Sequence, residues 1–111
     1  MLLDDYNTLN EIVRELRQEA AEIDAQIEYN NRCIREADKY VNKITRSESD
    51  DYRVFSPRKP ENLYKDEINR TIWEKSEYEE QNRNLVQKKD IIYDRIHRLE
   101  KILNKMFGEL L

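Results

Sequence analysis

Apolar residues recur at alternating intervals of three and four along the first part of the chain. If Tyr6 is placed at heptad position a, every member of the series falls at a or d for nearly six heptads, and Asn30 is its one polar member. Sustained spacing of this kind predicts a coiled-coil helix. The series is Tyr6, Leu9, Val13, Leu16, Ala20, Ile23, Ile27, Asn30, Ile34, Ala37, Val41 and Ile44.

A second series with the same spacing follows Tyr64. With Ile68 at position a, three later a positions are polar, namely Lys75, Asn82 and Lys89, whereas the stretch from Ile92 onward is strongly apolar. The second helix therefore has a weak first half and a strong second half. Its series is Ile68, Thr71, Lys75, Tyr78, Asn82, Leu85, Lys89, Ile92, Ile96, Leu99, Leu103, Met106 and Leu110.

The segment between the two series carries both prolines of the chain, Pro57 and Pro60. A proline disfavours helix at the residue before it and fits the first turn of a new helix. The serines and aspartates that follow Ile44 favour caps and turns over helix interiors. These signals predict a single domain with a helix over 1–47, a tip over 48–60 and a second helix over 61–108.

The two series can be folded onto each other by arithmetic. An antiparallel pair sets a of one helix opposite d of the other, and Asn30 (d) and Asn82 (a) have numbers that add to 112. The same sum pairs Ile44 with Ile68 and Ala20 with Ile92, and its midpoint is Ser56, inside the proline-bearing segment. The predicted fold is therefore all-α, an antiparallel two-helix coiled-coil hairpin.

The pairing of Asn30 with Asn82 carries a hypothesis of its own. A buried polar pair can fix the register of a coiled coil at some cost in stability. We interpret the two asparagines as such a register pair. The competing interpretation is that both side chains reach solvent at a loosely packed level.

Composition narrows the class of protein. Charged residues make up 40% of the chain, which alone is compatible with disorder, but the regular apolar spacing decides against it. The net charge is −4 and no segment is strongly basic, so a nucleic-acid partner is not expected. No apolar run approaches a membrane span, the acidic N-terminus is unlike a signal peptide, and Cys33 is the only cysteine. We expect a cytoplasmic protein without membrane insertion.

No residue pattern indicates catalysis, a metal or a cofactor. His97 falls at a b position, outside the seam, without a second histidine in the chain. Cys33 falls at a flanking g position, where a half-buried structural thiol is the simpler interpretation. We therefore expect that the chain is not an enzyme, binds no cofactor and holds no metal ion.

Several apolar residues lie outside both seams, and an isolated hairpin would leave much of this surface wet. Large exposed apolar surface marks an interface. We expect hairpins to pair as a homodimeric four-helix bundle, mainly through the half that holds the termini. The alternative is a monomeric hairpin with another protein on that face. The candidate dimer or partner face is Ile12, Tyr40, Ile72, Val86, Tyr93, Ile102 and Phe107.

The tip also offers candidate contacts. Phe55 stands close to Arg58 and Lys59, and an exposed aromatic residue beside basic residues and prolines is typical of a docking element. The competing interpretation, which we favour, is that Val54 and Phe55 fold back to cover the end of the seam.

The part of the chain from Val54 to Ile102 resembles the helical N-terminal sensor region of cytoplasmic bacterial histidine kinases of the DegS type. The similar features are Phe55-Ser56 in the turn, the Gln-, Arg- and Lys-rich stretch 81–89, and the stretch from Arg95 to Glu100. The resemblance implies a dimeric coiled coil that relays a signal to a following kinase domain. No phosphoacceptor helix or ATP-binding motif is present in this chain. The expected function is a non-catalytic interaction module of that signalling class; the alternative is a stand-alone coiled-coil adaptor or chaperone-like binding protein.

Overall fold

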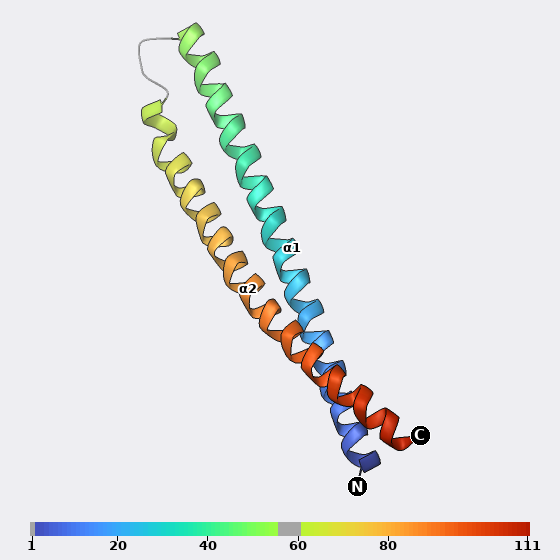
Figure 1. Ribbon diagram of the computed structural model, residues 1–111. Coiled ribbons are helices and arrows are strands. Elements are labelled where there is room, and N and C mark those ends of the chain that lie inside the picture. Colours follow the sequence, from blue (N-terminus) through green and yellow to red (C-terminus); the bar gives the residue numbers. More distant parts are fainter. Residues whose placement is uncertain (1, 56–60) are drawn as a thin grey trace. The chain divides into compact units, whose positions relative to one another are not determined.

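The computed structural model describes residues 2–55 and 61–111, and the surroundings of side chains for residues 2–46 and 65–111. It confirms the predicted fold class. Two helices, α1 (Leu2–Phe55) and α2 (Glu61–Leu110), form a hairpin (Figure 1). Asp4 and Asp5 lie in the first turn of α1, where carboxylates favour the positive end of the helix dipole.

The first helix is longer than the sequence pattern predicted. It ends at Phe55 rather than at residue 47. Serine and aspartate favour caps and turns but tolerate helix interiors, and the first residue that helix geometry disfavours is the one before Pro57. The start of α2 at Glu61, directly after Pro60, agrees with the predicted boundary.

The helices build two compact units, each of which pairs one segment of α1 with one segment of α2. The terminal unit consists of Met1–Ile27 and Arg83–Leu111, and the central unit is Glu28–Asn82. In the terminal unit the first segment of α1 (blue in Figure 1) lies beside the last segment of α2 (red), so both chain ends belong to this unit.

The core of the terminal unit consists entirely of seam residues predicted from the two series. Ala20 and Ile96 are each only 1% exposed, so the middle of the unit is dry. Burial of apolar area at about 25 cal/mol per Å² is the main stabilising contribution. The buried members are Val13, Ala20, Ile23, Ile92, Ile96 and Leu103; Tyr6, Leu9, Leu16, Ile27, Leu85 and Leu99 pack against them.

The central unit is packed less densely. Among its described side chains, only Ile44 and Asn30 are buried, whereas seam positions such as Ile34, Ile68 and Tyr78 are half-buried. The polar seam residues of α2 explain the difference, because a lysine or asparagine at the seam offers less apolar surface to bury. The weak first half of the second series is therefore visible in the packing.

Candidate interaction surface

The Asn30 side chain is the one buried polar group among the described residues, with 0% of its surface exposed. Its Nδ2 donates to Oδ1 of Asn82 at 3.0 Å and approaches Oε1 of Gln81 at 3.4 Å. Asn82 in turn donates from its Nδ2 to Oδ1 of Asn31 at 2.8 Å. The predicted pair is thus in direct contact at the predicted register. Its role in specifying that register stays a prediction.

Lysines at seam positions of α2 turn outward to aspartates of α1. Lys75 Nζ lies 2.8 Å from Asp38 Oδ1 in the central unit, and Lys89 Nζ lies 2.8 Å from Asp24 Oδ1 in the terminal unit. A long alkyl chain lets an ammonium group leave an apolar seam and remain in water. Each of these hydrogen bonds favours the charged lysine and raises its pKa above the ordinary value.

These polar contacts repeat with the heptad. The α1 partners Asp24, Asn31 and Asp38 are spaced by seven residues, and so are the α2 partners Lys75, Asn82 and Lys89. Each pair has numbers that add to 113. The polar seam residues were predictable from the sequence, but their aspartate partners were not predicted, although the shared seven-residue spacing was a visible signal.

The terminal unit has two flanks, one on each side of its seam. In an antiparallel pair the e positions of both helices line one flank and the g positions line the other. On the e flank, Arg17 Nη2 lies 2.7 Å from Glu100 Oε2. On the g flank, Glu19 Oε1 lies 3.9 Å from Lys88 Nζ. These cross-helix ion pairs confirm which positions share a side.

The candidate face residues of the terminal unit divide between these flanks. Ile12 and Ile102 hold g positions and are 38% and 47% exposed. Val86, Tyr93 and Phe107 hold e positions on the opposite flank and are also exposed, and the ring of Phe107 meets that of Tyr6 at a centroid distance of 6.4 Å. The predicted face is therefore two separate apolar surfaces in this unit.

The central unit places its two candidate face residues apart as well. Tyr40 holds a g position, and its hydroxyl donates to Oε1 of Glu67 on α2, which raises the pKa of Tyr40. Ile72 holds an e position and is exposed, as is the neighbouring Trp73. Exposed tryptophan is typical of contact surfaces, and Trp73 follows the e-side Ile72 directly in sequence.

Cys33 is half-buried, as its g position predicted, and it has two aromatic neighbours. Hydrogen bonds with Cys33 raise the pKa of Tyr29 and of Tyr78. An open groove beside the thiol is lined by residues of both helices, including Tyr40 and Thr71. These tyrosine neighbours favour the interpretation of Cys33 as a structural thiol.

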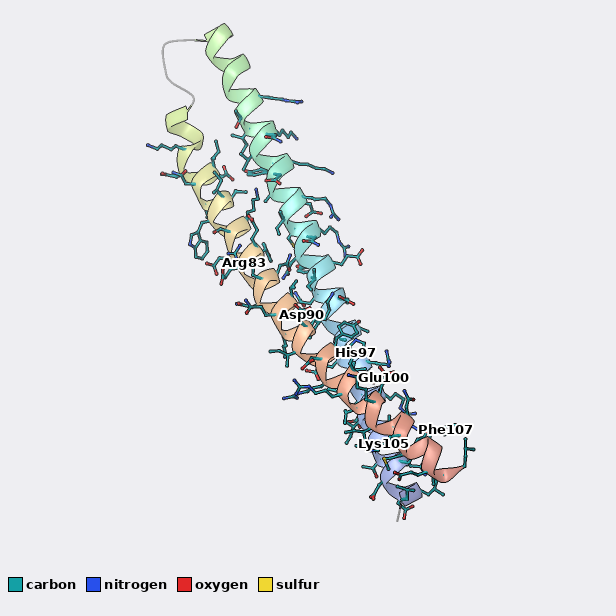
Figure 2. The ribbon with its side chains drawn as sticks, in the orientation of Figure 1. Arg83, Asp90, His97, Glu100, Lys105 and Phe107 are labelled. Carbon is teal, nitrogen blue, oxygen red and sulfur yellow. The ribbon has the colours of Figure 1, made fainter. Side chains whose placement is uncertain are left out.

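Figure 2 shows Arg83, Asp90 and His97 following one another along α2, with Glu100 and Phe107 further on. His97 is exposed, with Nδ1 3.9 Å from Oε1 of Glu100 one turn away. Within the described part of the chain, no group of three or more His, Cys, Asp or Glu side chains could hold a metal ion. The candidate tip contacts Phe55, Arg58 and Lys59 lie outside the described side chains.

Neither helix, over the residues that the structure describes, has a stretch long and apolar enough to cross a membrane. No protein-family model, curated protein or solved structure matches this chain.

Proposed function

We propose that the chain is a non-catalytic protein-interaction module that self-associates through its terminal unit. The observation that carries this proposal is the apolar surface left outside a seam that is already filled. Ile91, Ile102 and Phe107 are 58%, 47% and 51% exposed, although Ile92, Ile96 and Leu103 in the seam between them are buried.

Burying such side chains in an interface is favourable by about 25 cal/mol per Å² of apolar area. A helix of a two-helix hairpin can add a second partner helix on its free side, as helices in four-helix bundles do. Closed two-fold pairing is the commonest way for one chain to cover its own apolar surface. The terminal unit offers isoleucine, valine and aromatic side chains for this purpose.

Sedimentation equilibrium of the purified chain tests the proposal directly. We expect a reversible dimer, with a mass about twice the 13.6 kDa of one chain at micromolar concentration. Because apolar contacts would hold the dimer together, replacing an exposed isoleucine of this unit by aspartate should raise the protein concentration at which the dimer dissociates. A chain that stays monomeric up to millimolar concentration contradicts the proposal.

The resemblance of the segment from Val54 to Ile102 supports a finer proposal, that the module is the sensor and dimerisation region of a bacterial two-component histidine kinase. The gene region that follows the codon for Leu111 tests it. A phosphoacceptor helix and an ATP-binding domain, encoded in frame or in a neighbouring gene, would support the assignment. A gene neighbourhood without any kinase would count against it, while leaving the self-association untouched.

A further inference from the structure

The g flank of the terminal unit continues outward onto the c positions of both helices, and together they form a surface that we name the isoleucine flank. Its apolar residues are Ile12, Ile91 and Ile102, all of them exposed. The ion pair between Glu19 and Lys88 shows that its two stripes lie side by side. The α1 stripe is Asp5, Thr8, Ile12, Glu15, Glu19 and Glu22, and the α2 stripe is Lys88, Ile91, Arg95, Arg98, Ile102, Lys105 and Glu109.

The two stripes carry opposite charge. The α1 stripe has four acids and no base, and the α2 stripe has four bases and one acid. Charges at c positions point away from the neighbouring helix of the hairpin, so the hairpin itself cannot use them. Glu15, Glu22, Arg95 and Lys105 form no ion pair with another described residue, and Arg98 pairs with Asp94 on its own helix.

The e flank differs in this respect. It is also apolar, but its charged e positions are all engaged within the chain, Arg17 with Glu100 and Asp24 with Lys89. On the isoleucine flank, Glu19 and Lys88 form the one ion pair across the hairpin among the described residues. A surface that combines exposed isoleucines with unpaired charges of both signs, separated onto two stripes, is complementary to a second copy of itself. This charge pattern distinguishes the isoleucine flank from the e flank.

We propose that a second copy of this chain packs on the isoleucine flank, with α1 of each copy against α2 of the other. This inference rests on the proposed self-association and specifies how the two copies are oriented. A symmetric pair of hairpins has its two-fold axis either along the helices or across them. The axis along the helices sets the acidic stripe against the basic stripe, whereas the axis across them sets acid against acid and base against base. Like charges in contact disfavour the second arrangement.

The levels of the contacts follow from the register of the hairpin. Residues of α1 and α2 at one level have numbers that add to about 113, as Asp24 and Lys89 show. A two-fold axis along the helices keeps these levels between copies. Ile12 of one copy then lies at the level of Ile102 of the other, and Glu15 at the level of Arg98. Apolar and charged contacts are satisfied by the same orientation.

A charge swap measured by sedimentation equilibrium tests the orientation. Glu15→Lys and Arg98→Glu are each expected to raise the dimer Kd about tenfold. A single exposed ion pair contributes little, but the two-fold symmetry places each substitution in the interface twice. The double variant Glu15→Lys/Arg98→Glu restores the Kd to within about twofold of the original, since the pair is re-formed with reversed signs. Helical circular dichroism checks that each variant is folded.

Matched controls separate this surface from the rest of the unit. Glu11→Lys makes the same charge change one turn away at an f position, and should leave the Kd within about twofold. Ile102→Asp should raise the Kd by tenfold or more, whereas Val86→Asp on the e flank should not.

The outcomes distinguish the two proposals. A chain without any dimer overturns both. A dimer that tolerates Ile102→Asp and Glu15→Lys uses another surface, which overturns the present inference and leaves the self-association standing. A dimer that Glu15→Lys strengthens, or that the double variant fails to restore, has the other orientation and overturns the inference too.

Discussion

Replacing Asn30 and Asn82 together by leucine is expected to make the hairpin more stable and less exact in its register. Asn30 is completely buried and bonded to Asn82, which is half-buried. Both positions belong to the seam, so leucine side chains there would pack against apolar neighbours. The substitution removes the one fully buried amide among the described residues together with Asn82, and the side chains of Asn31 and Gln81 that lose a partner are exposed to water.

The expected gain in the free energy of unfolding can be estimated from these contacts. A fully buried leucine at position 30 contributes roughly 2 kcal/mol, and a half-buried one at position 82 about half of that. The substitution also removes the neutral hydrogen bonds that join Asn30 to Asn82 and Asn82 to Asn31, each with a net contribution of about 1 kcal/mol, and the longer 3.4 Å contact of Asn30 with Gln81, which contributes less. The difference is a gain of about 1 kcal/mol, within the range in which apolar packing outweighs paired amides.

Two measurements follow the two effects. Urea unfolding reports the change in the free energy of unfolding. Because association makes the apparent stability depend on protein concentration, all variants are compared at one fixed concentration. Disulfide trapping in a Cys33→Ser background reports the register. The pair Ile34→Cys/Tyr78→Cys matches the observed register, and Ile34→Cys/Thr71→Cys matches a slip of one heptad.

With the asparagines present, only the matching pair should form an intrachain disulfide under oxidising equilibrium. In the leucine variant, the slipped pair should form as well. If the leucine variant still forms only the matching disulfide, the asparagine pair is not what specifies the register. If the variant instead unfolds at lower urea, the hydrogen bonds of Asn30 outweigh the apolar burial that replaces them.

Three further predictions follow from the packing and from the pKa shifts. Ile96→Ala should lower the free energy of unfolding by about 2–4 kcal/mol, because Ile96 is 1% exposed, whereas Ile72→Ala, at a half-exposed site, should cost under about 0.5 kcal/mol; equal urea midpoints for the two variants would contradict this. The raised pKa of Lys89 means that its contribution is fully present below its unfolded pKa of about 10.5 and is lost as pH rises through the higher folded value, so the urea midpoint should fall less steeply above pH 10.5 in Lys89→Met than in the original chain. Cys33→Ala should lower the pKa of Tyr29 toward 10, seen as an earlier phenolate absorbance in an alkaline titration, and an unchanged titration would show that the hydrogen bond with Cys33 does not set the shift.

The parts of the fold that could be predicted from the sequence are those that follow from regular spacing along each helix. The seam residues were predictable because the heptad spacing is set by the pitch of the helix itself, and every core residue of the terminal unit came from the two series. The contact of Asn30 with Asn82 was predictable because both asparagines interrupt apolar series, and one sum aligns the rest. The end of α1 at Phe55 was not, because the caps and turns that serine and aspartate favour compete only weakly with a continuing helix.

The interaction surface depended on the pairing of the helices. The sequence alone determined that residues such as Ile12 and Phe107 lie outside the seam, since their heptad positions follow from spacing along one helix. Only the antiparallel pairing of α1 with α2 decided that these two residues lie on opposite flanks of the terminal unit, and that Lys89 leaves the seam for Asp24. The heptad position of a residue determines the direction of its side chain relative to its own helix. The residues that this side chain contacts across the seam belong to the other helix. The flanks and their charges therefore became visible only in the tertiary structure.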